Sequence, residues 1–339
     1  MREPTEMTET GEDQPLKQDP EQGPHRRNGK LHSIFVGNGG LRPGWGCLAF
    51  LLALFLLGFS TNFLAKLLLH SQGRPQGSTI SPALMVPVEL ISVTLVLLVT
   101  FLMARLERRP LARFGLSDRA LPSRLIGGLV AGFAAISALV GVLWAMHLLV
   151  LHGPVLHGQQ IAGYGLVWAL GFLLTGIFEE MLLRGYLLFT LARGLGFVPS
   201  ALLLSAGFGL IHGNNAGETL VGLFSAGAVG LLFCLSIWYT GSLWWAIGFH
   251  AAWDWGESFF WSTSDSGTMV KGHLFYEHPA GAILLSGGAT GPEGSLFVFP
   301  VLLVCALFVF LWWRGKQAPG YRLVSAQGRL PDPGFVENR

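Results

Sequence analysis

Two neighbouring carboxylates interrupt an otherwise apolar stretch of the chain. Glu179 and Glu180 follow a long apolar run, and Arg184 comes four positions after Glu180. Residues four apart share one face of a helix, so Glu180 and Arg184 are placed to form an ion pair. Adjacent residues point about 100° apart around a helix, so Glu179 points elsewhere. We therefore expect a supporting Glu180–Arg184 pair and a Glu179 that is free to act as a general base.

Two histidines lie in later apolar stretches. His212 follows Phe208 by four residues, and Asp254 follows His250 by four residues. On a helix, the Asp254 carboxylate would lie beside the His250 imidazole and orient it, polarise a substrate or bind a metal ion. Each pattern alone also suits helix packing or a helix end. Because ionisable groups inside membrane spans are costly and mark functional sites, we predict a catalytic set of Glu179, His212, His250 and Asp254.

The composition indicates that the elements carrying these residues face lipid. Of the 339 residues, 51% are hydrophobic and 12% are charged. A soluble domain has about 25% charged residues, so this chain has too few to cover a globule with a water-facing surface. We predict an all-α fold, a polytopic helix bundle in a lipid bilayer. The net charge of +2 gives no indication of a nucleic-acid partner, and we expect none.

Eight stretches of the chain are candidates for transmembrane helices. A bilayer core requires about 20 mostly apolar residues in a helix. We place the spans at residues 45–69, 81–104, 125–151, 164–188, 199–212, 220–239, 243–261 and 296–313. The fourth, fifth and seventh spans carry the candidate residues. Tilted helices could bring these residues together in one cavity that water enters.

The distribution of Lys and Arg predicts the orientation of the bundle. Short cytoplasmic loops are enriched in positive charge. With eight spans and both termini cytoplasmic, nearly all basic residues fall on the cytoplasmic side, and the opposite loops hold little beyond Arg74 and Lys271. The richest loop, between the second and third spans, contains Arg105, Arg108, Arg109, Arg113, Arg119 and Arg124.

These features divide the chain into five regions. We expect a disordered cytoplasmic tail at residues 1–43, and N-terminal transmembrane helices at 44–160 with a basic interfacial segment at 105–124. Tails rich in polar residues, Gly and Pro bury too little apolar surface to offset the entropy of ordering. The catalytic core is placed at 161–262, an outer loop and the last span at 263–315, and a second cytoplasmic tail at 316–339.

At these residues the sequence resembles the CPBP family of intramembrane proteases, which includes the type II prenyl-protein (CaaX) proteases and the bacteriocin-processing and immunity (Abi-like) proteins. The family pattern is a Glu pair with Arg four residues on, then Phe with His four residues on, then His with Asn or Asp four residues on. This chain has Glu179, Glu180 and Arg184, then Phe208 and His212, then His250 and Asp254, in that order.

The resemblance implies intramembrane peptide hydrolysis. Glu179 would activate a water, His212 would assist as a base partner or position the water, and His250 with Asp254 would stabilise the oxyanion. Glu180, Arg184 and Phe208 would support them. Many members carry Asn where this chain has Asp254. An ionised Asp has no N–H to offer an oxyanion, which favours an orienting or metal-ligating role for Asp254.

The residues leave the use of a metal open. Glu179, His212, His250 and Asp254 could ligate zinc with one position free, or the same set could work without metal as a glutamate-type protease. The HExxH motif of zinc metalloproteases does not occur in the sequence. We therefore expect an endopeptidase of one of these two types, with zinc as a possible cofactor.

The substrate and location follow from the resemblance alone. It implies a membrane-associated peptide or prenylated-protein substrate and, from the bacterial members that the run Gly241-Ser242-Leu243-Trp244 resembles, the plasma (inner) membrane of a bacterium. Two alternatives remain: a catalytically inactive membrane scaffold or immunity protein, and an ion- or proton-coupled transporter. A transporter predicts inverted repeats or discontinuous helices, and we find no internal repeat.

Overall fold

The computed structural model describes residues 35–37, 40–69, 79–215 and 217–315. Within them the fold is an all-α polytopic bundle with a few short strands, as the composition predicts. The two predicted tails lie outside the described residues, apart from a short segment before residue 43 with strands β1 (Val36–Gly37) and β2 (Gly40–Leu41).

Every predicted span falls on a helix. The eight helical segments are α2 (Pro43–Leu69), α3 (Pro82–Leu106), α4 (Leu121–Ala145), α5 (Gln159–Glu180) continuing into α6 (Leu188–Leu195), α7 (Phe197–His212), α8 (Leu220–Thr240), α9 (Trp244–Trp255) and α11 (Val298–Trp313). Five described helices are long and apolar enough to cross a membrane, including the unit of α5 and α6 over Gln159–Leu195. The helices α7 and α11 are apolar but shorter.

The ends of two predicted spans are wrong. The third was expected to continue to residue 151, but α4 ends at Ala145 and the chain turns into strand β4 (Leu149–Pro154). The fourth was expected to end at residue 188, but it continues through a π-helical turn, η2 (Met181–Leu187), into α6. Helix α4 ends because His147 has a positive φ of 57°, which a helix does not accommodate.

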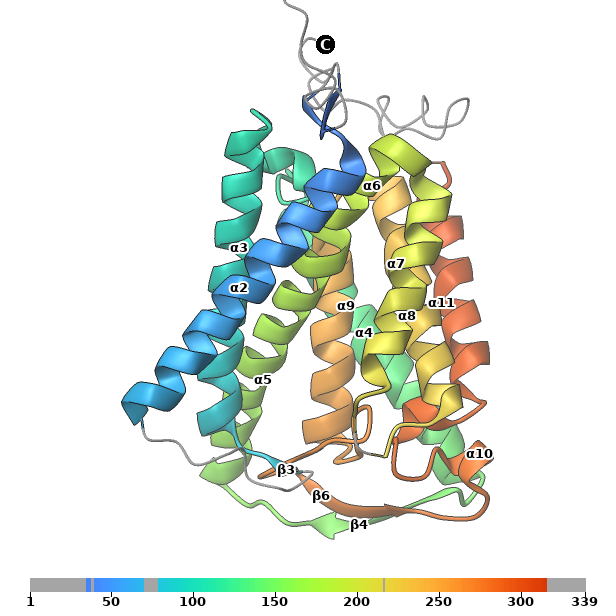
Figure 1. Ribbon diagram of the computed structural model, residues 1–339. Coiled ribbons are helices and arrows are strands. Elements are labelled where there is room, and N and C mark those ends of the chain that lie inside the picture. Colours follow the sequence, from blue (N-terminus) through green and yellow to red (C-terminus); the bar gives the residue numbers. More distant parts are fainter. Residues whose placement is uncertain (1–34, 38–39, 70–78, 216, 316–339) are drawn as a thin grey trace, which may run out of the picture.

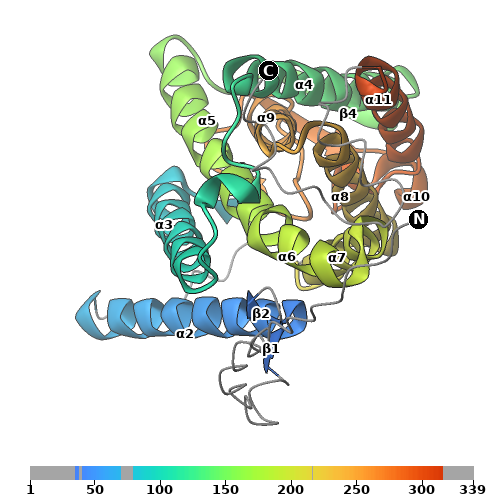
Figure 2. The same ribbon diagram turned by 90° about the horizontal axis from the view of Figure 1, so that it is seen from above.

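Helix α9, which carries His250 and Asp254, lies inside the bundle. Seen along the helices, α4, α5 and α8 surround α9, while α2 and α3 lie at the outside (Figure 2). Close packing against α4 depends on small residues: a side chain at Gly128 or Gly132 would collide with the backbone of α9. The outer face of α2 is apolar and exposed, with Phe55, Phe59 and Phe63 stacked along it, as a lipid-facing helix requires.

One end of the bundle is basic. The C-terminal ends of α3, α6 and α11 lie there with the N-terminal ends of α4 and α9 (Figure 1). The basic segment after α3 forms a 3-10 turn, η1 (Leu111–Phe114), whose Phe114 is fully buried. It is tied to the turn before α9 by a hydrogen bond from the Leu243 amide to the Gly115 carbonyl at 3.0 Å. The segment therefore packs against the helix ends.

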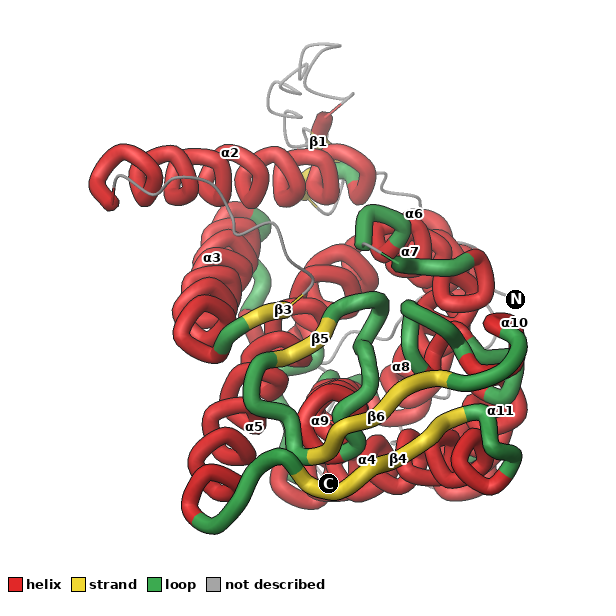
Figure 3. Tube along the Cα trace, turned by 90° about the horizontal axis from the view of Figure 1, so that it is seen from below, coloured by secondary structure: helices red, strands yellow, loops and turns green. Residues whose placement is uncertain are grey.

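The opposite end is closed by strands and short helices. Strand β4 pairs with β6 (Phe275–Pro279), and β3 (Thr79–Ile80) pairs with β5 (Met269–Val270); together they lie across the helix ends (Figure 3). The loop predicted at 263–295 therefore contains β5, β6, helix α10 (Ile283–Ser286) and the 3-10 turn η4 (Pro292–Gly294). These elements cover the end of the bundle that lies beyond His250.

Candidate active site

The predicted Glu180–Arg184 ion pair is present. Both side chains are fully buried, with Arg184 Nη1 3.0 Å from Glu180 Oε1. The Arg184 guanidinium also lies over the Phe208 ring, 4.5 Å from its centroid, which stabilises a buried cation. The pair sits where α5 passes into the π-helical turn η2, a distortion common at functional sites. A side chain at Gly230 would collide with the guanidinium, so glycine in α8 makes room for it.

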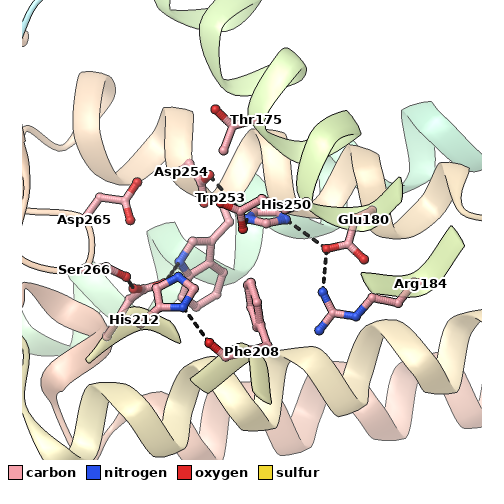
Figure 4. Close-up of polar contacts among 12 residues, drawn as sticks. Thr175, Glu180, Arg184, Phe208, His212, His250, Trp253, Asp254, Asp265 and Ser266 are labelled. Atoms are coloured by element: carbon pink, nitrogen blue, oxygen red, sulfur yellow. Dashed lines mark hydrogen bonds and ion pairs between the residues drawn. The ribbon is translucent and has the colours of Figure 1, made fainter. Parts of the chain in front are cut away.

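Three carboxylates surround the His250 imidazole (Figure 4). Glu180 Oε1 lies 3.1 Å from Nδ1 of His250. On the other side of the ring, Nε2 lies 3.6 Å from Glu179 Oε2 and 3.5 Å from Asp254 Oδ2. Glu179 and Glu180 were expected to serve different directions, and they do so at opposite nitrogens of one ring. Glu180 thereby contacts His250 as well as Arg184.

His212 reaches the same space from α7. Its Nδ1 lies 2.8 Å from the Phe208 carbonyl oxygen, so Nδ1–H donates to the preceding turn and Nε2 remains available. The Phe208 ring meets the His212 ring edge to face, with centroids 4.6 Å apart. No direct contact joins His212 to Glu179, His250 or Asp254 in the described structure. Of the four predicted residues, Glu179, His250 and Asp254 therefore contact one another through the His250 ring. His212 lines the same cavity without contacting them.

A cavity of about 220 Å³ brings all four predicted residues together. Glu179 and Thr175 of α5, Phe208 and His212 of α7, and His250 and Asp254 of α9 all line it. Glu180 and Arg184 do not line it; they lie behind Glu179 and His250. Apolar side chains complete the wall, among them Ile80, Met85, Phe172, Val229 and Phe233.

Sequence reasoning missed several polar residues of the cavity wall, among them Glu89, Asp265, Ser266 and Glu293. Glu89 belongs to α3, and the prediction, which drew its candidate residues from the fourth, fifth and seventh spans, did not include it. A lone carboxylate in an apolar span was the available signal. Asp265 and Ser266 lie in a loop and Glu293 lies in the 3-10 turn η4, and polar residues are common in such segments. Their proximity to the site arises from the fold of residues 261–297.

The cavity is rich in acidic groups. Its wall holds two imidazoles and five carboxyl groups, and no Lys or Arg is among its described lining residues. The carboxyl groups are those of Glu89, Glu179, Asp254, Asp265 and Glu293. In the loop beyond α9, burial raises the pKa of Asp265 well above its ordinary value, and the neighbouring Asp254 and Glu293 raise it further. A loss of a proton inside this cavity is thus costly unless a positive group compensates.

The four residues proposed as zinc ligands do not gather as a zinc site. Nδ1 of His212 contacts the Phe208 carbonyl and Nδ1 of His250 contacts Glu180, so each histidine could offer only Nε2 to a metal. Within the described residues, three potential ligand atoms come within 4.8 Å of one another only at Glu257, Asp265 and Glu293. Zinc bonds measure about 2.0–2.3 Å, which requires a tighter set than Glu179, His212, His250 and Asp254 form.

The comparison with protein families agrees with the predicted resemblance. Residues 161–256 match the model described as type II CAAX prenyl endopeptidase Rce1-like. No curated protein and no solved structure matches the chain. The matched segment extends from α5 through α9 and contains Glu179, His212, His250 and Asp254. Residues 161–256 are therefore similar to the Rce1-like type II CAAX prenyl endopeptidases, which supports the resemblance to the CPBP intramembrane proteases.

Proposed function

We propose that the protein is an intramembrane endopeptidase in which Glu179 activates a water molecule. The observation that carries the proposal is the convergence of Glu179, His212 and His250 from three helices on one cavity of an apolar bundle. Glu179 Oε2 is buried and has no hydrogen-bond partner among the described groups. A carboxylate oxygen held in this way can accept a proton from water at the moment of attack.

The balance of protons assigns a role to each side chain. Glu179 takes a proton from the water, and the hydroxide attacks the carbonyl carbon of the scissile peptide bond. His250, when protonated, donates Nδ1–H to Glu180, and its Nε2–H is shared between Asp254 and the developing oxyanion. The C–N bond then breaks, and the amine leaves with the proton that Glu179 received. His212 Nε2 positions the water, and Asp254, 3.5 Å from His250 Nε2, orients the imidazole.

We propose the glutamate type of this chemistry, because the four side chains do not fit zinc as they stand. No step needs an ion between them. Glu180 and Arg184 hold His250 and the η2 turn in place. This assignment of roles leaves Asp254 as a positioning residue and does not require it to donate a hydrogen bond.

The substrate we propose is a membrane-associated peptide whose scissile bond enters the cavity between α3, α5 and α7. Apolar side chains on this path, including Met85 and Phe172, suit an apolar segment or a lipid anchor. A prenylated peptide is the first candidate, because the family is described by that activity. With the basic end of the bundle in the cytoplasm, the plasma membrane of a bacterium is the location we propose.

The test is peptide cleavage by the purified protein in detergent, read by mass spectrometry. Glu179→Gln should lower the rate at least about 10³-fold. Thermal unfolding should stay close to that of the parent, since the ion pair of Glu179 with His250 is long, at 3.6 Å. Glu277→Gln, the same substitution in strand β6, should retain full activity. Normal turnover by Glu179→Gln would remove the proposed base.

The variant Glu89→Gln tests whether Glu179 or Glu89 is the base, since each of them has a buried oxygen without a hydrogen-bond partner among the described groups. Glu89 Oε2, like Glu179 Oε2, has no hydrogen-bond partner within the described part of the chain. Because His250 faces Glu179, we expect Glu89→Gln to lower the rate less than about tenfold. The reverse order of effects would assign the base to Glu89. Inactivity of the parent on all peptides, with intact folding, would favour the inactive scaffold.

A further inference from the structure

Three carboxyl groups gather at the end of the bundle beyond the active site. Glu257 lies in the π-helical turn η3 (Gly256–Phe260), Asp265 in the loop after it, and Glu293 in η4. One oxygen of each lies within 4.8 Å of the others. Glu257 is seven residues past His250 on the same helical run, about two turns. Asp265 and Glu293 also line the catalytic cavity, whereas Glu257 lies behind its wall.

The backbone holds these groups together. Gly291 has a φ of 102°, and a side chain there would collide with the Ser264 carbonyl oxygen. Only glycine therefore lets the segment before Glu293 lie against the segment before Asp265. The Gly267 amide also donates to the Thr290 carbonyl at 2.9 Å. The closeness of the carboxyl groups is thus imposed by the chain itself.

Only neutral donors meet these carboxylates in the described structure. The Trp253 indole N–H lies 3.0 Å from Glu257 Oε2 and 2.8 Å from Glu293 Oε1. The Ser266 hydroxyl donates to Glu293 Oε2 at 2.8 Å, and the Ser258 hydroxyl lies 3.3 Å from Asp265 Oδ2. No Lys or Arg forms a salt bridge with any of the three among the described ion pairs.

The environment of Glu257 indicates that the cluster binds a cation. Glu257 is fully buried, and its Oε1 has no hydrogen-bond partner among the described groups. An ideal Cβ at Gly291 would lie 3.4 Å from that oxygen, so Oε1 faces the Gly291 segment that leads to Glu293. A buried carboxylate oxygen without a partner is costly unless a cation or proton satisfies it.

We propose that Glu257, Asp265 and Glu293 bind a hard divalent cation of the Ca²⁺ class. Such ions take carboxylate oxygens as ligands, and each carboxylate oxygen has a second lone pair beyond the hydrogen bond that it accepts. A divalent charge would compensate three clustered carboxylates that form no salt bridge with Lys or Arg among the described residues. The ion would join the helical run of α9 and η3 to the segments that carry Asp265 and Glu293, and so fix one wall of the catalytic cavity.

The orientation of the bundle sets the expected affinity. The basic loops lie at one end of the bundle, and the carboxylate cluster lies at the opposite end (Figure 1). We place this opposite end outside the cytoplasm. Extracellular calcium sites bind with Kd on the order of 10⁻⁴–10⁻³ M. A site of this kind would be filled outside the cell. The proposal does not depend on peptide cleavage, because binding can be measured in a protein that lacks Glu179.

Terbium luminescence tests the site directly. Tb³⁺ replaces Ca²⁺ at oxygen sites and emits when a nearby tryptophan is excited, and Trp253 donates to two of the three proposed ligands. Full-length protein, first stripped with chelator, should show saturable emission with one ion per chain, and added Ca²⁺ should compete. Asp265→Asn and Glu293→Gln should each weaken apparent binding at least tenfold, whereas Glu277→Gln should bind as the parent does.

A third variant and thermal unfolding with Ca²⁺ provide independent tests of the ion site. Glu257→Gln tests the buried ligand; if that variant does not fold, the half-buried Asp265→Asn carries the conclusion. Saturating Ca²⁺ should raise the Tm of the parent and of Glu179→Gln, but not of Asp265→Asn. Emission that is absent, or equal in the parent and both ligand variants, would overturn the proposal and leave three carboxyl groups that share protons. Binding with no peptide cleavage would leave the ion site standing and count only against the protease.

Discussion

Two carboxylates at different depths of the bundle, the buried Glu107 and the partly exposed Glu179, have opposite hydrogen-bonding environments. At the basic end, the fully buried carboxylate of Glu107 accepts from Tyr186 at 2.5 Å, Arg193 at 2.9 Å and Arg109 at 3.2 Å. In the cavity, Glu179 has an oxygen without a hydrogen-bond partner among the described groups and only His250 beside it at 3.6 Å. One carboxylate is fully satisfied, and the other is not.

This difference in hydrogen bonding indicates that Glu107 stabilises the fold, whereas Glu179 is available for chemistry. A complete set of charge-assisted hydrogen bonds fixes the ends of α3 and α6 and leaves no oxygen free to react. An incompletely satisfied carboxylate costs stability, and the fold keeps it where a water and a substrate supply the remaining partners. The comparison predicts that substitutions at the basic end change folding, and that substitutions in the cavity change turnover.

Glu107→Ala is the strongest test of the stability half. It leaves Arg193 and Arg109 beside a cavity without their acceptor, and removing one partner of a buried pair costs about 3–5 kcal/mol. We expect a clear fall in the midpoint of thermal unfolding in detergent. Tyr186→Phe, which removes one neutral donor, should cost only about 1 kcal/mol. Equal effects of the two variants would show that the charges contribute little.

Glu180→Gln should affect both properties, because Glu180 contacts Arg184 and His250. The fully buried Arg184 would lose the only carboxylate that it pairs with among the described residues, at a cost of about 3 kcal/mol. The cleavage rate should fall at least about tenfold, since His250 loses the acceptor that orients it. Adding Arg184→Gln to Glu180→Gln should recover part of the stability without recovering the rate. Recovery of both would reduce Glu180 to a packing residue.

The helical bundle and one ion pair of the site could be predicted from the sequence. Few charges and eight apolar stretches predicted the helical bundle, and four-residue spacings predicted the Glu180–Arg184 pair. Spacing describes one helix at a time, so it could not show that Glu179 and Asp254 meet at the same nitrogen of His250. The positions of Asp265 and Glu293 depend on close loop packing at Gly291, which no local pattern reveals.

Asp254→Asn sharpens the cavity half of the comparison. If Asp254 orients His250, an amide oxygen can still accept from the imidazole, so the cleavage rate should fall no more than about tenfold. Asp254→Ala removes the acceptor and should lower the rate about 10²-fold. Initial rates on one peptide at a fixed pH measure both. An Asn variant as inactive as Glu179→Gln would mean that an ionised carboxylate is required at this position.

Glu277 in β6 gives the smallest effect and a defined pH dependence. Burial raises the pKa of its carboxyl from 4.5 to about 7, and its Oε2 has no hydrogen-bond partner within the described structure. The folded state holds the proton more tightly than the unfolded state. The parent therefore loses stability as the pH rises from 4.5 to 7.

A glutamine at this position stays neutral, so Glu277→Gln should match the parent below pH 4.5 and be more stable above pH 7. The gain should be about 1 kcal/mol, because the side chain is partly exposed and solvent screens it. Thermal unfolding at pH 4.5 and 8 measures the difference. A parent and variant that differ equally at both pH values would show that packing of the β4–β6 pair, and not the charge, sets the stability of this end.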